Sequence, residues 1–162
     1  MRGARKVLAS LTLTGLALVL ALVPQRASSN SGGRATQAEN AEPVPAFHSE
    51  VPSGALPVTM SPSLFPQPVE QNAYAVAARI KKVLYQEPCY CHCDRSQGHA
   101  SLLDCFVSRH AAGCNICMKE DFYAYEQFRK SKTAAQIREG IKRGEWDKVD
   151  MTKYQPALPA EQ

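Results

Sequence analysis

The stretch that decides the fold lies at residues 88–117 and reads PCYCHCDRSQGHASLLDCFVSRHAAGCNIC. It holds all six cysteines of the 162-residue chain, first as C-x-C-x-C, then as a single cysteine, and last as C-x-x-C. Three of the four histidines lie in the same stretch. Because the thiols and imidazoles are concentrated in so short a segment, we expect the chemistry of the chain to reside here.

Thiols and imidazoles at this spacing predict a metal site. In an extended C-x-C-x-C segment the three thiols project to one side, and the C-x-x-C pair opens a predicted helix whose N-terminus favours the thiolate. Soft thiolate ligands select Cu(I) or Zn(II). Six cysteines and two histidines are enough for two four-coordinate ions. The predicted ligands are Cys89, Cys91, Cys93, Cys105, Cys114, Cys117, His99 and His110.

Disulfide bonds are the main alternative use of the six thiols. An even number of cysteines favours a disulfide framework if the chain is exported. In an extended segment, residues two apart have Cα atoms about 7 Å apart, at the limit of disulfide geometry. We therefore expect the cysteines of the 89–93 segment to face not one another but Cys105, Cys114 and Cys117. A third interpretation is a thiol–disulfide redox protein that uses the C-x-x-C pair.

Helical patterns flank the cysteine-rich stretch on both sides. Residues 70–86 place apolar side chains at steps of three and four, which predicts a helix that ends before Pro88. Residues 102–107 predict a short helix that carries Cys105, and the pattern that begins at Cys114 predicts a longer one. The C-x-C-x-C segment between them is expected to be extended or looped.

The last predicted helix begins at a capping box formed by Thr133 and Gln136, and Gly144 provides a suitable end. No stretch alternates polar and apolar residues as a strand would. The sequence therefore predicts an all-α fold, a small cysteine-rich domain of about four helices over residues 69–150. The tail at 151–162 is predicted to be disordered.

Two segments of different composition precede this domain. Residues 1–29 begin with basic side chains and continue with an uncharged apolar run at 7–23. They end with Pro24 and small residues. This pattern predicts a secretory signal peptide or, if it is not cleaved, an N-terminal membrane anchor. Eight of the eleven prolines lie at 24–68 without apolar periodicity, so residues 30–68 are predicted to form a disordered linker.

The charge of the chain argues against a nucleic-acid partner. The net charge is +4, but the first 29 residues carry four basic side chains and no acid, which leaves 15 basic and 15 acidic residues in the rest. A neutral exported chain has no electrostatic attraction for nucleic acid. The expected location is extracytoplasmic, and the expected partners are a metal ion and a membrane protein or metal-receiving protein.

The residues do not predict an enzyme. The chain contains no serine-elbow motif, no paired carboxylates at a defined spacing and no phosphate-binding glycine loop. A non-catalytic role is therefore expected, and thiol–disulfide chemistry is the one enzymatic alternative.

The motifs resemble those of a bacterial family of extracytoplasmic proteins named for its PCYCGC motif. The similarity rests on PCYCHC at 88–93, on the Gly98-His99 pair, on His110 and on the C-x-x-C pair, and it extends from about Val69 to Trp146. The resemblance implies export or lipid anchoring rather than a particular activity. It also favours metal slightly, because a pure disulfide scaffold does not need histidines.

Two features depart from the family pattern. His92 stands where the motif has glycine, and no cysteine precedes Cys89 to accept a lipid at the end of the signal segment. Membership therefore predicts location and domain extent more firmly than it predicts attachment through a lipid.

Overall fold

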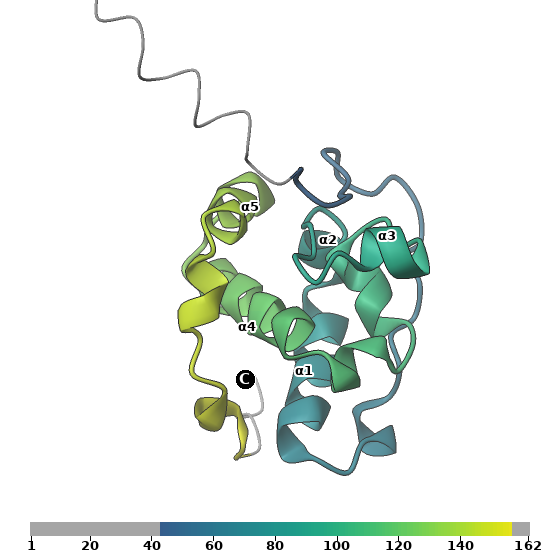
Figure 1. The fold of residues 1–162 in the computed structure, drawn as a ribbon, viewed down its shortest axis with the longest axis vertical. Coiled ribbons are helices and arrows are strands. Elements are labelled where there is room, and N and C mark those ends of the chain that lie inside the picture. The colour runs from purple at the N-terminus through teal and green to yellow at the C-terminus, as the bar shows by residue number, and fades with distance from the viewer. Residues whose placement is uncertain (1–42, 157–162) are drawn as a thin grey trace, which may run out of the picture. The chain divides into compact units, whose positions relative to one another are not determined.

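The computed structural model describes residues 43–156, which fold as one unit. The predicted signal or anchor segment 1–29, the first part of the predicted linker and residues 157–162 lie outside the described residues. The described residues form helices, turns and loops without any strand, so the predicted all-α class is confirmed (Figure 1). Among these residues no helix is long and apolar enough to cross a membrane.

Five α-helices carry most of the regular structure of the described part. They are α1 (Pro68–Arg79), α2 (Lys81–Leu84), α3 (Cys93–Gln97), α4 (Asn115–Arg129) and α5 (Ala134–Lys142). Short 3-10 helices precede, connect and follow them: η1 (Pro62–Leu64), η2 (Leu102–Phe106), η3 (His110–Gly113), η4 (Glu145–Lys148) and η5 (Met151–Tyr154).

Helix α4 lies at the centre of the domain, between α5 on one side and α1 on the other (Figure 1). Its sequence buries residues on more than one face, including Cys117, Phe122 and Ala124, which are fully buried. Helix α1 contributes small side chains, Ala73 and Ala77, to the same core. Cys117 lies in the first turn of α4, and its thiol packs in the hydrophobic core rather than at the surface.

The helix expected at 70–86 is interrupted at Ile80. This residue has φ −112° and ψ 29°, and the chain changes direction there between α1 and α2. The bend lets Val83 and Leu84 enter the core. The predicted capping box at α5 is confirmed: the Gln136 backbone N–H donates to Thr133 Oγ1 at 3.3 Å, and the Thr133 N–H donates to Gln136 Oε1 at 3.0 Å.

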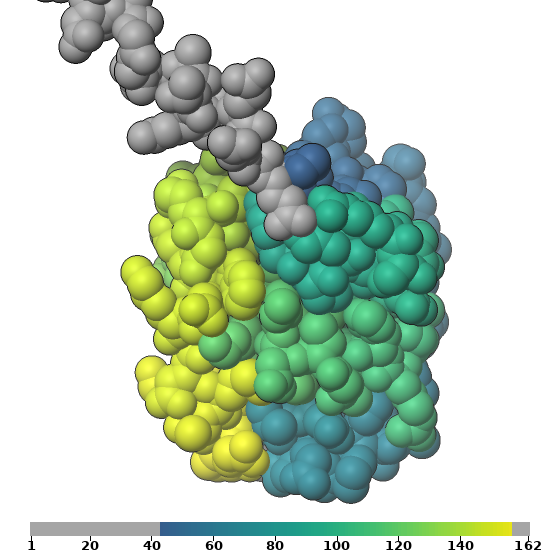
Figure 2. All heavy atoms as spheres, in the orientation of Figure 1, coloured from purple at the N-terminus to yellow at the C-terminus, as the bar shows by residue number. Residues whose placement is uncertain are grey.

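The prediction of a disordered linker does not hold for residues 43–68, which lie against the helices (Figure 2). Phe65 is buried and stacks on Tyr74 with ring centroids 3.9 Å apart, and His48 stacks on Tyr85 at the same separation. The Met60 N–H donates to the Phe106 carbonyl at 2.9 Å. Isolated apolar side chains between the prolines dock individually, without the periodicity from which burial is usually predicted.

The predicted disorder of the tail is wrong for its first residues. Met151–Tyr154 form η5, and the Tyr154 ring stacks on Phe122 of α4 with centroids 3.6 Å apart. The Asn72 side-chain amide also donates to the Tyr154 carbonyl at 2.6 Å. Asn72 donates to the Pro156 carbonyl as well, and the Tyr154 hydroxyl donates to Glu126, so the end of the domain is held against both α1 and α4.

Packing of the 43–68 segment can be tested with Phe65→Ala. Phe65 is 3% exposed, so its truncation should leave a cavity and lower the free energy of unfolding by about 3–5 kcal/mol. The matched control is Val58→Ala in the same segment, because Val58 is 82% exposed and should have little effect. Urea denaturation of the reduced protein measures both. Equal midpoints for the two variants would show that the segment is not docked.

Candidate metal centre

The C-x-C-x-C segment, which was expected to be extended or looped, turns back on itself and is not extended. The His92 N–H donates to the Cys89 carbonyl at 3.1 Å, which closes a turn through Tyr90 and Cys91. His92 then adopts a left-handed conformation, with φ 55° and ψ 34°. Cys93 begins α3 directly afterwards. The turn brings the Cys89 and Cys91 sulfurs to 3.3 Å from each other, so these two thiols do face one another, contrary to the prediction.

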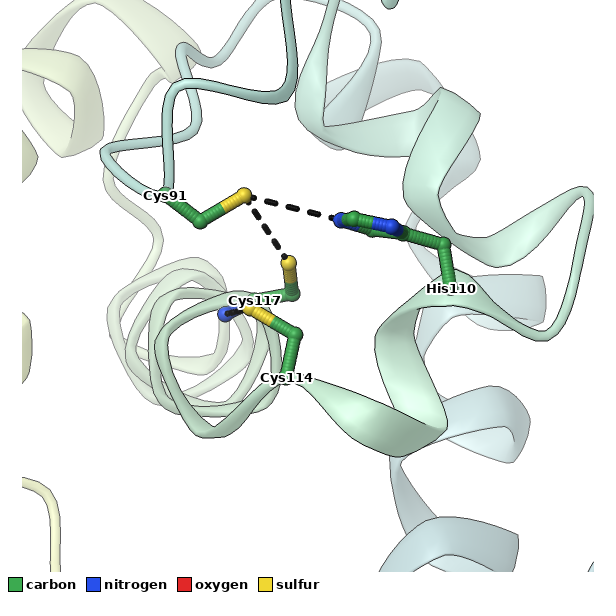
Figure 3. A group of neighbouring side chains, drawn as sticks. All are labelled: Cys91, His110, Cys114 and Cys117. Atoms are coloured by element: carbon green, nitrogen blue, oxygen red, sulfur yellow. Dashed lines mark hydrogen bonds between the residues drawn. The ribbon is translucent and has the colours of Figure 1, made fainter. Parts of the chain in front are cut away.

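One group of potential ligands, here called the outer group, consists of Cys91, His110, Cys114 and Cys117. Their side chains converge from the turn, from η3 and from the start of α4 (Figure 3). The Cys91 sulfur lies 3.6 Å from His110 Nε2 and 3.5 Å from the Cys117 sulfur. Three of the four side chains are partly exposed, and only Cys117 is buried. An ion held here would therefore be reachable from solvent.

The local sequence explains how α4 presents two of these thiols. Cys114 is the N-cap residue of α4, and its sulfur accepts the Cys117 N–H at 3.3 Å. A C-x-x-C pair at a helix start places the second thiol one turn into the helix, beside the cap. The hydrogen bonds of Cys114 with Cys117 lower the pKa of the Cys114 thiol, but the neighbouring Cys91 and burial raise it, and the resulting pKa is about 11, above the ordinary value of a thiol.

The second group, here called the inner group, consists of Cys93, His99, Cys105 and again His110. The Cys105 sulfur lies 3.3 Å from the Cys93 sulfur and 3.3 Å from His99 Nδ1. Both cysteines are buried. Burial, and then the neighbouring His110, lower the pKa of His99, which keeps its imidazole neutral as metal binding requires.

Cys89 lies between the two groups and belongs to neither set of four. Its sulfur is 3.3 Å from that of Cys91 and 3.5 Å from that of Cys117. It also forms two sets of three within 4.8 Å, one with Cys105 and Cys117 and one with Cys91 and Cys93. The structure thus brings all eight predicted side chains together, and each of the six cysteines is a free thiol.

The separations between the donor atoms fit a metal ion. A tetrahedral ion with metal–sulfur bonds of about 2.3 Å holds its sulfur ligands about 3.8 Å apart. The sulfurs and ring nitrogens in contact here are 3.3–3.6 Å apart, so a small expansion would accommodate an ion. Interactions with neighbouring thiols, Cys105 first, hold the pKa of Cys91 below its ordinary value.

Two buried acids next to the centre were not predicted from the sequence. Glu120 lies one turn after Cys117 on α4, and its Oε1 accepts the Tyr90 N–H at 2.8 Å, which fixes the turn between Cys89 and Cys91. Burial raises the pKa of Glu120 to about 8 and that of Glu87, directly before the PCYC sequence, to about 9. The sequence feature that could have indicated Glu120 is its three-residue spacing from Cys117, since this spacing places both side chains on one helix face.

A third buried acid, Asp121, gives a testable pH dependence. It is fully buried, neither carboxyl oxygen has a hydrogen-bond partner among the described residues, and burial raises its pKa well above the ordinary value. The folded chain therefore keeps this proton at pH values where the unfolded chain has released it. The resulting stabilisation is complete at acidic pH and is lost as the pH rises towards the folded-state pKa.

Asp121→Asn should therefore flatten the dependence of stability on pH. Above pH 4.5, the free energy of unfolding of the parent protein should fall more steeply than that of the variant, by about 1.4 kcal/mol per pH unit. Urea denaturation of the metal-free, reduced protein between pH 4.5 and 6.5 measures both slopes. The exposed Glu50→Gln is the control and should keep the parent slope. A parallel shift of the Asp121→Asn curve would contradict the assignment of a buried, protonated carboxyl.

Comparison with known proteins places the chain in a family. Residues 27–148 match the family model described as "Protein of unknown function with PCYCGC motif", and the matched range contains all eight potential ligands. No curated protein and no solved structure gave a significant match.

The geometry explains the glycine of the family motif. That glycine corresponds to position 92, where the chain has a left-handed conformation that glycine adopts without steric cost. This chain places a histidine in the same conformation, one of the few other residue types found there with some frequency. The family match covers most of the 162 residues, and the turn, the six cysteines and the two histidines lie within it: the chain belongs to the PCYCGC-motif family.

Proposed function

We propose that this protein binds a soft metal ion, Cu(I) or Zn(II), outside the cytoplasm, and that it does so without catalysing a reaction. The observation that carries the proposal is the convergence of six thiols and two imidazoles into overlapping sets whose donor atoms lie within 4.8 Å of one another. Soft thiolate ligands select these two metals over harder cations.

The histidines favour metal over a scaffold held by disulfides alone. His99 Nδ1 lies 3.3 Å from the Cys105 sulfur, and His110 Nε2 lies 3.6 Å from the Cys91 sulfur. A disulfide has no use for an imidazole at this position, whereas zinc sites combine the two ligand types. The thiols also meet in sets larger than pairs: Cys89 contacts two other sulfurs, and a disulfide can use only one.

The number of ligands supports a binding role rather than catalysis. A catalytic zinc site keeps one position open for water or substrate, whereas a site that holds its ion with four protein ligands is closed. Either group offers four side chains to one ion, and His110 is common to both groups. Storage of the ion or its transfer to a receiving protein is the function that such closed sites support.

The proposed location rests on the N-terminal sequence. The basic start, the uncharged run at 7–23 and the small residues after Pro24 favour export, with a cleaved signal or a retained anchor as the two forms. The partner of an exported metal-binding protein would be a membrane protein or a second metal-binding protein that receives the ion.

Metal content and intact mass test this proposal directly. The full chain, produced with its own N-terminus and purified from the extracytoplasmic fraction without chelator, should contain stoichiometric copper or zinc. After removal of the metal, its thiols should react with an alkylating reagent. A metal-free protein with six unreactive sulfurs and a mass about 6 Da lower, from three disulfides, would refute the proposal in favour of a disulfide-stabilised module. The same mass reports whether the signal segment has been removed.

The two histidines can be tested as ligands by substitution. The double variant His99→Ala, His110→Ala should bind the metal found in the purified protein at least about 10-fold more weakly. That is the loss usually seen when a group that only supports a metal ligand is removed. His48→Ala is the matched control, since this ring stacks on Tyr85 and is not part of either ligand group. Competition with a chromophoric chelator measures both affinities. Equal affinity in the double variant would restrict the ligands to sulfur.

A further inference from the structure

We infer that the centre holds two metal ions at once and that the Cys89 thiolate bridges them. The inference rests on the proposed metal binding and specifies the architecture of that site. It assigns Cys89 a role different from that of the other five cysteines, which would each bind one ion.

The first argument is the partition of the ligands. Three side chains belong only to the outer group and three only to the inner group, while His110 belongs to both. Each ion therefore has three ligands of its own and needs a fourth. Cys89 is the one remaining cysteine of the cluster, and its sulfur, shared between the two ions, supplies the fourth ligand of both without His110.

The second argument is the position of the Cys89 sulfur. Its direct contacts, at 3.3 and 3.5 Å, are with two sulfurs of the outer group, Cys91 and Cys117. It also forms sets within 4.8 Å that include inner-group sulfurs, Cys93 in one and Cys105 in the other. The other sulfurs of these two sets each have a neighbour in the opposite group as well, but Cys89 is the one residue that belongs to both sets. Its sulfur is therefore the one best placed to share its lone pairs between two ions.

The third argument is electrostatic. The two groups share His110, so ions at their centres would lie only a few ångström apart in a partly buried site, where repulsion between cations is screened less than in water. An anionic sulfur between the ions offsets this repulsion. Cys89 is 3% exposed, and a buried thiolate is itself tolerated only when it is paired with positive charge. The two ions and the bridge therefore stabilise one another, which predicts that both ions bind in one cooperative step.

Cadmium is a suitable probe because ¹¹³Cd²⁺ occupies thiolate-rich zinc sites and has a nuclear spin. The metal-free, reduced full chain is titrated with ¹¹³Cd²⁺ and followed by native mass spectrometry and ¹¹³Cd NMR. We expect two ions per chain, with the two-ion species forming before the one-ion species accumulates. We also expect two resonances, each split by coupling to the other cadmium through the shared sulfur.

Two variants that each remove one thiol separate a bridging from a terminal ligand. In Cys89→Ala both resonances should move and their mutual splitting should disappear. In the matched control Cys114→Ala, which removes a terminal ligand of the outer group, one resonance should move much more than the other and the splitting should remain. Circular dichroism checks that each variant folds. If Cys89→Ala does not fold, the presence or absence of splitting in the parent protein decides.

The outcomes distinguish this inference from the proposed function. Two bound ions without mutual splitting would mean two separate sites, and a single bound ion would mean one site. Either result overturns the bridging role of Cys89 and leaves soft-metal binding intact. A chain that binds no cadmium, copper or zinc would instead overturn the proposed function itself.

Discussion

The reversal of the chain between Cys89 and Cys93 is the constraint on which the rest of the candidate site depends. It requires the left-handed conformation of His92. The hydrogen bond from the Tyr90 N–H to Glu120 stabilises it. Helix α4 supplies both this anchor and Cys117, one turn apart, so the helix that offers a ligand also fixes the loop that offers three more. Loop and helix are therefore joined directly beside the sulfurs.

Placing the sulfurs in the core has consequences for the energetics of the fold. Cys93, Cys105 and Cys117 are packed among the apolar side chains, where neutral thiols behave as small hydrophobic groups. Binding an ion requires thiolates, so the same positions change from apolar to ionic. The neutral forms that burial favours in Glu87, Glu120 and Asp121 add no further negative charge to this region. The interior is thus compatible with both states, and an ion bound by these thiolates would add to the stability of the domain.

Local patterns in the sequence predicted the helical class, the capping box at Thr133 and the eight side chains that the structure brings together. They did not predict the turn at Cys89–Cys93, because a left-handed conformation belongs to a single backbone position and produces no periodic pattern in the sequence. Only a glycine at that position would have indicated it. The buried acids were missed for a related reason, since carboxyl groups are read as solvent-facing from composition. Phe65 and Tyr154 were missed because each docks as a single ring, in segments whose remaining residues indicate disorder.

The left-handed conformation of His92 also limits how this family can vary. Glycine, asparagine, aspartate and histidine tolerate such a backbone, whereas β-branched residues resist it. A valine or isoleucine at this position would push the backbone towards an extended form and separate Cys89 and Cys91 from Cys93. Random substitution at one residue that is not among the candidate ligands can therefore dismantle the centre, and the position should accept few neutral changes. Histidine is one of the few replacements that enlarge the side chain while keeping the turn.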